Sequence, residues 1–307
     1  MRIEKNEMFL AAVSLILNGL VGFLRLIPIR AGQFLGRMLG RFLGIAAVGP
    51  MKSSLNGLRM VFGDRMSEKQ LRRLNRRVVL HFAQMLFEVP HILNLNLKNL
   101  DRYVYFENEE VLAEVLARGK GCFVLTGHFG NWELMSVAVA LRFQASGAVV
   151  ARPADFAPVE ELLMRLRTRF GTEVIPKKKG MKKLLKGTRE NKVMGILLDQ
   201  NVDWYEGVFV PFLGQTACTN KGLALIAMKT GSPVVPMFSV RQPDGRYRVV
   251  FEKEVDLIRS GSKLSDTEEN TALFNRIINK YIYWYPEQWF WFHKRWKTRP
   301  VCPFPRK

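Results

Sequence analysis

The sequence is poor in the residues that build metal sites and disulfide frameworks. It contains three cysteines and four histidines among 307 residues. Cys122, Cys218 and Cys302 are too few and too scattered for a disulfide framework, and no Cys-x-x-Cys pair indicates zinc. Neither a phosphate-binding loop nor a dinucleotide fingerprint occurs in the chain. We therefore expect a reducing compartment, no metal and no cofactor.

Acidic residues are scarce relative to basic ones. The chain has 27 Asp and Glu against 47 Lys and Arg, a formal net charge of +20, and residues 1–100 alone hold 15 basic against 5 acidic residues. Such a field favours an anionic partner, and nucleic acid, anionic lipid or an acidic carrier protein would each satisfy the charge. No nucleic-acid recognition motif appears, and the basic residues lie beside apolar helical segments. We therefore expect no nucleic acid partner.

The N-terminal segment carries the longest apolar run. Residues 8–24 hold 17 positions without a charge, the short limit for a membrane span. Pro28 and more basic sequence follow in place of a cleavage site, so we expect a retained anchor. Residues 31–49 set Arg37 and Arg41 among apolar side chains, as in a basic helix lying in the headgroup region. A buried helical hairpin packed on the domain is the alternative.

These features divide the chain into two parts. Residues 1–49 are expected to form a membrane anchor and a basic interfacial helix, and residues 50–307 the main domain. The basic residues that follow the apolar run place that domain on the cytoplasmic side of the membrane.

The rest of the chain alternates between helical and strand patterns. Residues 67–97 repeat apolar positions at helical spacing. Short apolar runs predict strands at 121–126, 148–151, 172–175, 193–198 and 233–240, and helices fit at about 108–118, 132–143, 157–169, 179–189, 220–230 and 267–284. Residues 245–256 alternate like a half-exposed antiparallel strand. The pattern predicts an α/β fold with a central, mostly parallel sheet flanked by helices, and sites beyond the carboxyl ends of its strands.

The run HFGNWE, residues 128–133, is the strongest candidate for chemistry. A buried strand and a turn precede His128, and Asn131 is placed to cap a helix that begins at Trp132. Across such a turn, Glu133 can fold toward His128 and hold one imidazole nitrogen protonated. The other nitrogen would then accept a proton from an attacking hydroxyl. A structural role for a histidine at this position is the alternative.

The same run resembles the H-x4-D/E signature of the bacterial lipid A late acyltransferases, which are lauroyl and myristoyl transferases of the glycerolipid-acyltransferase-like superfamily. Further segments match in order along essentially the whole chain: Ala151-Arg152-Pro153, Asp199-Gln200, Val210 to Gly214 with Thr219 and Lys221, Gly231 to Pro236, and Trp291 to Pro300.

The resemblance implies a membrane-associated O-acyltransferase. It would move a fatty acyl chain from an acyl carrier protein thioester to a hydroxyl of a Kdo-linked lipid A precursor, at the cytoplasmic face of the bacterial inner membrane. It further implies that His128 is the general base and that Glu133 orients it.

The resemblance also implies that Arg152 is a positive group near the reacting centre and that Asp199 and Gln200 belong to a loop of the site. With Asn131, these are the residues that we expect to bind substrate. The residues themselves leave two simpler roles open: Arg152 could pair with a carboxylate, and Asp199 could cap a turn.

Two other functions remain compatible with the sequence. One is an acyltransferase of the same superfamily that acts on another glycolipid or lipid acceptor. The other is a catalytically silent, basic membrane protein. Apolar residues at 208–213 and 290–296 are candidates for lining an acyl tunnel, whose depth would set the acyl chain length.

Overall fold

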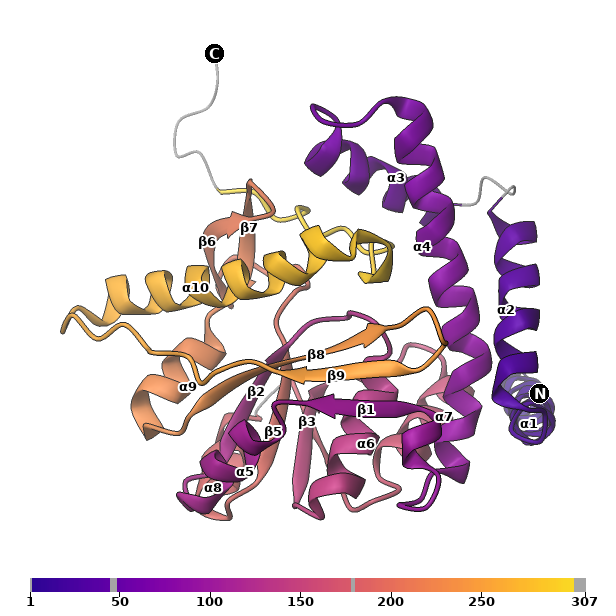
Figure 1. The fold of residues 1–307 in the computed structure, drawn as a ribbon, viewed down its shortest axis with the longest axis horizontal. Coiled ribbons are helices and arrows are strands. Elements are labelled where there is room, and N and C mark those ends of the chain that lie inside the picture. Colours follow the sequence, from indigo (N-terminus) through magenta and orange to yellow (C-terminus); the bar gives the residue numbers. More distant parts are fainter. Residues whose placement is uncertain (1, 45–48, 178–179, 301–307) are drawn as a thin grey trace.

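The computed structural model describes residues 2–44, 49–177 and 180–300, and its centre is a seven-stranded sheet (Figure 1). The strand order is β1-β9-β8-β2-β5-β3-β4, and every neighbouring pair is parallel except β8 and β9. The strands are β1 (Val104–Glu107), β2 (Cys122–Thr126), β3 (Gly147–Ala151), β4 (Glu173–Pro176), β5 (Val193–Leu197), β8 (Val234–Arg241) and β9 (Tyr247–Phe251). The predicted fold class and the antiparallel strand near residue 250 are confirmed.

Helices pack on both faces of this sheet. They are α3 (Gly49–Phe62), α4 (Glu68–Glu88), α5 (Glu110–Ala117), α6 (Trp132–Phe143), α7 (Ala157–Arg167), α8 (Met181–Arg189), α9 (Gly222–Thr230) and α10 (Lys263–Trp284), with 3-10 turns η1 (Val89–Asn94), η2 (Leu100–Arg102) and η3 (Pro286–Gln288). The buried apolar residues form two hydrophobic cores. Strand β2 contributes to both because its side chains alternate between the two faces of the sheet: Phe123 and Leu125 lie in one core, and Val124 lies in the other.

Helix α3 and the strands β1, β6 (Gly207–Phe212) and β7 (Gln215–Asn220) were not predicted from the sequence. The short strand β1 lies at the edge of the sheet beside β9. A separate hairpin joins β6 to β7. Its two-residue turn is Leu213-Gly214, and both residues have positive φ, 49° and 77°. A turn of that kind matches the twist of a hairpin, so the Val-Pro-Phe-Leu-Gly segment folds back on itself.

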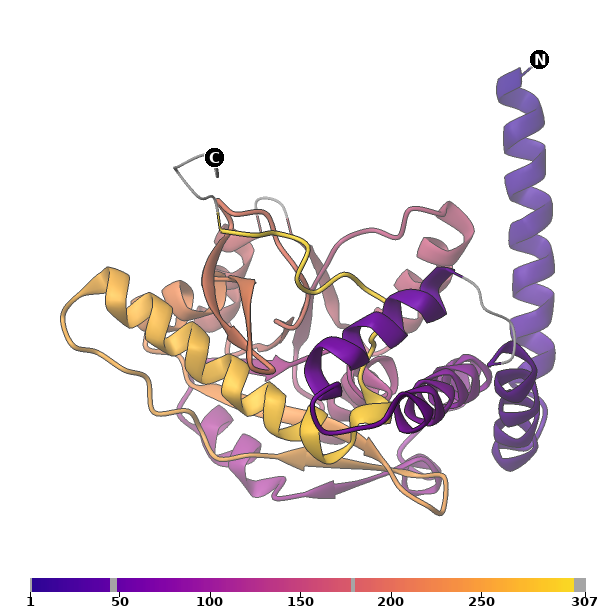
Figure 2. The same cartoon turned by 90° about the horizontal axis from the view of Figure 1, so that it is seen from above.

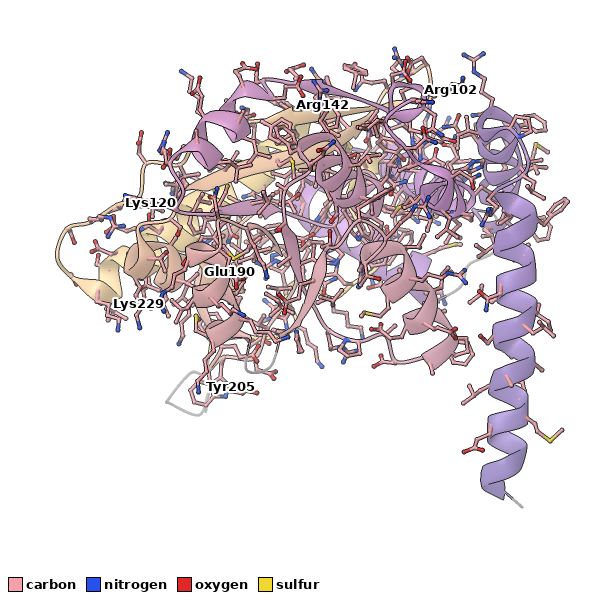
Figure 3. The ribbon with its side chains drawn as sticks, turned by 90° about the horizontal axis from the view of Figure 1, so that it is seen from below. Arg102, Lys120, Arg142, Glu190, Tyr205 and Lys229 are labelled. Atoms are coloured by element: carbon pink, nitrogen blue, oxygen red, sulfur yellow. The ribbon has the colours of Figure 1, made fainter. Side chains whose placement is uncertain are left out.

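The N-terminal helices α1 (Arg2–Leu24) and α2 (Ile29–Leu43) lie on the same side of the molecule (Figures 1 and 2). In Figure 3 the N-terminal part of α1 extends past the remaining elements, with its side chains in open space. Among the described residues, one helix segment, Glu7–Leu24, is long and apolar enough to cross a membrane. Helix α2 exposes Phe34, Met38 and Phe42.

Glycines set how closely α2 approaches α4. A Cβ added to Gly36 would lie 2.6 Å from the Cα of Gln84, and one added to Gly40 would lie 2.9 Å from the Cα of Leu80. Both neighbouring atoms belong to the backbone, which cannot swing away. Helix α2 therefore packs on the domain with one face and leaves an apolar face exposed.

Replacing Gly36 by leucine should force α2 away from α4. Overpacking of this kind costs about 1–3 kcal/mol of unfolding free energy, measured by denaturant titration in detergent. Gly19→Leu in α1 is the matched control, because a Cβ there meets nothing within 4 Å. Both changes raise helix propensity equally, so equal stabilities of the two variants would contradict the packing argument.

Candidate active site

The order of the strands brings two distant loops together. Strands β2 and β5 are parallel neighbours in which Thr126 pairs with Leu197, so their carboxyl ends meet at one edge. His128 follows β2 by two residues, and Asp199 follows β5 by two residues. Although 71 positions separate them in the sequence, their side chains lie in contact.

Asp199 makes two hydrogen bonds to His128 and accepts a third from Trp289. Its Oδ1 lies 2.8 Å from the ring Nδ1 of His128, and its Oδ2 accepts from the backbone N–H of His128 at 2.8 Å. The same Oδ2 accepts from Nε1 of Trp289 at 2.7 Å. The carboxylate is fully buried. Burial alone would raise the pKa of Asp199, but the charge and hydrogen bond of His128, with help from His293 and Trp289, hold that pKa below its usual range.

The other ring nitrogen of His128 faces the cleft. Because the Asp199 carboxylate accepts from Nδ1, the network assigns the ring proton to Nδ1 and leaves Nε2 as an acceptor. The side-chain amide of Gln200 lies 3.2 Å from Nε2 and donates to it. Within residues 2–44, 49–177 and 180–300, no serine or cysteine side chain is hydrogen-bonded to this ring. The ring is therefore placed to act on a hydroxyl that a substrate brings in.

Glu133 has a different partner from the one that we predicted. Both of its carboxylate oxygens accept from Arg167, with Nε at 2.9 Å from Oε2, and Oε1 also accepts from the Trp132 indole at 3.1 Å. In the described part of the chain, Glu133 makes no hydrogen bond to His128, so the expected direct contact is wrong. The physical reason is that Arg167, from the end of α7, occupies the carboxylate. Glu133 reaches His128 only through Trp132, whose ring packs edge-on to the imidazole at 5.1 Å.

The remaining predicted site residues divide between the cleft and the core. Asn131 is fully buried, and its Oδ1 accepts from the backbone N–H of Leu134 at 3.0 Å. It caps α6 as expected, but its burial contradicts the prediction that it binds substrate. Asp199 is buried too and cannot reach a substrate. Arg152 and Gln200 both line the cleft, and Arg152 pairs with Asp155 at 2.7 Å.

The cleft beside His128 has a volume of about 680 Å³. It runs over the carboxyl ends of β2, β3 and β5, and α7, α8 and the start of α9 form its other walls. Arg152, Arg167, Lys177 and Lys221 line it, and the first three are paired with Asp155, Glu133 and Glu206. Among the described residues, no group of three or more His, Cys, Asp or Glu could hold a metal ion.

Residues at the end of η3 and just after it are hydrogen-bonded to the loop that carries His128, residues 127–131, which we call the histidine loop. The backbone N–H of Phe290 donates to the carbonyl of His128 at 3.0 Å, and that of Gly130 donates to Gln288 at 2.8 Å. Gly130 has a φ of 59°, and a Cβ there would lie 1.6 Å from the carbonyl oxygen of Ser239, so only glycine fits. The sequence indicated this segment as a family match, but not Trp289 as the third partner of the buried carboxylate.

A buried charged cluster supports the same loop. Both oxygens of Glu88 in α4 accept from the guanidinium of Arg241 in β8. Tyr247 donates to Glu88 at 2.7 Å, and Gln33 of α2 donates to it at 2.8 Å. Because each member has partners, the cluster joins α2, α4 and the β8–β9 hairpin without leaving a bare charge.

His81 connects this cluster to the histidine loop. Its Nδ1 accepts from Nε of Arg241, and its Nε2 lies 3.2 Å from the carbonyl of Gly130, both contacts being consistent with a neutral ring. Burial, followed by the charge of Arg241, holds the pKa of His81 well below its usual value of 6.5. The folded protein therefore needs this ring uncharged.

The stability of the protein should depend on the charge of His81. Because its pKa is lower in the folded state, the unfolded chain takes up the proton first. The contribution of His81 is complete above about pH 6.5 and is lost as pH falls, by up to about 1.4 kcal/mol per pH unit. His81→Gln keeps both hydrogen bonds but cannot titrate, so denaturant titrations from pH 7.5 to 5 should give a flatter slope. His91 and His293, whose pKa values are also lowered, account for the slope that remains. An unchanged slope would contradict the assignment.

An open cleft at the carboxyl edge of a mostly parallel sheet, with an acceptor nitrogen of a histidine facing into it, is the arrangement of an α/β enzyme. The model of the family described as bacterial lipid A biosynthesis acyltransferase matches residues 5–298. The chain belongs to this family, and it is therefore an acyltransferase of lipid A biosynthesis.

Individual relatives agree with the family. The chain is 28% identical over 276 residues to the lipid A biosynthesis lauroyltransferase of Escherichia coli, covering 88% of this chain and 85% of that protein. It is 25% identical over 278 residues to a lipid A biosynthesis acyltransferase of Haemophilus influenzae, covering 90% and 85%. Among solved structures, the 1-acyl-sn-glycerophosphate acyltransferase of Thermotoga maritima aligns with a TM-score of 0.37 at 14% identity, over 79% of this chain and 97% of that one.

Proposed function

We propose that this protein transfers a fatty acyl chain from an acyl carrier protein thioester to a hydroxyl of a Kdo-linked lipid A precursor, with His128 as general base. The observation that carries the proposal is the position of His128: its Nδ1 is held by a buried carboxylate while its Nε2 faces the cleft. The family and the relatives named for lipid A biosynthesis support the acceptor.

The reaction is a direct transfer between two substrates. The acceptor hydroxyl displaces the Gln200 amide from Nε2 of His128 and gives its proton to that nitrogen while its oxygen attacks the thioester carbonyl. Asp199 stabilises the imidazolium that forms. When the carbon–sulfur bond breaks, the departing thiolate takes the proton back from His128. Arg152 in the cleft wall supplies positive charge for the developing oxyanion.

In this proposal Glu133 is a positioning residue. Its bidentate pair with Arg167 joins α6 to α7 at the cleft wall, and its contact with the Trp132 indole orients the ring that packs on His128. The pair is nearly buried, with side chains 8% and 15% exposed. Removing either partner would leave an uncompensated charge beside the reaction site.

A narrow apolar cavity next to the cleft is the proposed place for the acyl chain. It lies between α6 and strands β2, β3 and β5, and it shares Trp132, Ser136, Val149 and Leu197 with the cleft. Its walls are almost entirely apolar. The segments predicted to line a tunnel are used elsewhere: Phe212 and Trp291 are fully buried in the core.

Filling this cavity should favour shorter acyl donors. Gly195 of β5 lines it, and a Cβ there would lie 3.4 Å from Val149, an ordinary contact. We expect Gly195→Val to lower kcat/KM for long donors by about fourfold for each methylene excluded, since each buried methylene is worth about 0.8 kcal/mol. The measurement is kcat/KM across a series of acyl chain lengths. The shortest donor is the internal control, and equal losses for all donors would rule out this location.

Membrane attachment is proposed to occur through residues 1–49. The apolar segment of α1 and the exposed face of α2 lie on one side of the molecule. Residues 50–307 would then form the acyltransferase domain, which faces the cytoplasm at the bacterial inner membrane. The positive charge of the first hundred residues supports this orientation.

The function is tested with purified full-length protein in detergent. Incubation with an acyl carrier protein thioester and a Kdo-linked lipid A precursor should give a product heavier by one acyl group. The same assay with an acyl coenzyme A donor tests whether the carrier protein is required. An assay with an unrelated glycolipid tests whether the lipid A precursor is the preferred acceptor. Equal rates on the unrelated glycolipid would show that the acceptor is misassigned, and no transfer from the carrier would show that the donor is.

A further inference from the structure

A second cavity lies at the base of the N-terminal helix, apart from the reaction cleft. Its volume is about 490 Å³, and it lies open to solvent between the C-terminal part of α1, η1 and the end of α7. Asn18, Val21 and Leu93 form its walls, and three arginines, Arg25, Arg165 and Arg169, complete it. None of its lining residues also lines the reaction cleft.

The three arginines of this cavity have no carboxylate partner. No ion pair joins Arg25, Arg165 or Arg169 to an acidic side chain in the part of the chain that the structure describes. Arg167, on the same helix end as Arg165, is by contrast fully paired with Glu133. Glu161, one helical turn before Arg165, is engaged by the hydroxyl of Ser14 at 3.0 Å. The cavity therefore gathers three guanidinium groups that form no ion pair among the described residues.

Contacts with neighbouring residues hold the backbone of Arg25 and the side chain of Arg169. The side-chain amide of Asn94 donates to the backbone carbonyl of Arg25 at 2.7 Å, which fixes the chain as it leaves α1. The guanidinium of Arg169 stacks over the ring of Phe170 at 5.2 Å from its centre. Such preorganisation lowers the entropy that an anion must overcome on binding.

The position of the cavity identifies the kind of anion. Arg25 ends the 17-residue apolar run, so the cavity lies where the apolar surface of α1 gives way to charge. On an inserted α1 this boundary falls at the level of lipid headgroups. Guanidinium groups match the geometry of phosphate, which they bind through paired hydrogen bonds.

We propose that this cavity binds the phosphate group of an anionic membrane lipid. The proposal rests on the proposed membrane attachment through α1, and it assigns a lipid site that is separate from the reaction cleft. Because Arg165 and Arg169 flank Arg167 on one helix end, an occupied cavity would also anchor α7, which forms a wall of the cleft.

The test uses the full-length protein, vesicles of pure phosphatidylcholine, and vesicles that also contain phosphatidylglycerol. The site variant is Arg165→Gln with Arg169→Gln. The control is Arg73→Gln with Arg76→Gln, which removes the same charge from exposed positions of α4. We expect the preference for phosphatidylglycerol vesicles to fall about tenfold further in the site variant than in the control, since hydrogen bonds to a charged group exceed surface attraction. Both variants should unfold at the wild-type temperature.

The outcomes separate the site from the attachment. Binding of the wild type to phosphatidylcholine vesicles reports attachment alone, and its absence overturns the anchor and the lipid site together. Normal binding there with equal losses in both variants overturns only the site, because net charge then explains the preference. If inorganic phosphate abolishes the difference between the variants, the cavity takes free phosphate and the lipid assignment is wrong.

Discussion

Replacing His128 by alanine should lower kcat for acyl transfer by about 10²–10⁴-fold, the usual contribution of a general base. Its Nε2 faces the cleft as an acceptor, because the buried Asp199 holds the ring proton on Nδ1. KM for both substrates should change far less, since the ring contacts the reacting hydroxyl rather than the bulk of either lipid. The measurement is steady-state transfer followed by mass spectrometry of the product.

The thermal stability of the His128 variants must be measured together with their kcat. Removal of the imidazole takes one partner from the Asp199 carboxylate, while Trp289 and the backbone N–H of residue 128 remain. His128→Gln, which keeps a polar side chain, should be as inactive as His128→Ala but closer to wild type in thermal unfolding. A variant that folds normally and retains full activity would remove His128 from the reaction.

Asp199→Asn should be nearly as damaging as loss of the histidine, although it changes one oxygen to nitrogen. Trp289 and the backbone N–H of His128 both donate to Oδ2, so the amide oxygen must stay there and the amide NH₂ must face Nδ1. It would then donate to Nδ1 and move the ring proton to Nε2, where it blocks proton uptake. A carboxylate-to-amide change with this tautomer effect costs about 10⁴-fold in serine proteases, and we expect a loss of that order in kcat.

Glu133→Gln is the matched comparison for this prediction. It makes the same chemical change at the other carboxylate near His128, but the hydrogen bond at Nδ1 is untouched because Glu133 bonds to Arg167 and Trp132. The loss in kcat should be much smaller than for Asp199→Asn, with a cost in stability from the unpaired Arg167. The reverse order would restore Glu133 as the group that orients the base.

Most strands of the sheet could be predicted from the sequence, because buried parallel strands correspond to short apolar runs. Cys122 to Thr126 and Val193 to Leu197 are such runs, and both were placed correctly. The hairpin around Leu213 was missed because Pro211 interrupts its strand pattern. The four-residue edge strand β1 was too short to stand out against the helix that follows it.

The partner of His128 could not be derived from the sequence because it depends on strand order. The interpretation put Asp199 at the end of a strand, yet nothing in a single sequence says that this strand lies beside the one before His128. Sequence proximity favoured Glu133, which is five residues away. In the structure, His128 pairs with Asp199, 71 residues away, because the carboxyl ends of β2 and β5 meet at the same edge of the sheet.

Coupling between His128 and Asp199 is the most direct test of the central claim, that the two residues act as one unit. The measurement is kcat for His128→Ala, for Asp199→Asn and for the double variant, each corrected for the folded fraction. Residues that act as a unit are strongly non-additive, so the double variant should be no slower than His128→Ala alone. A double variant slower by the product of the two single losses would show that Asp199 acts independently of His128.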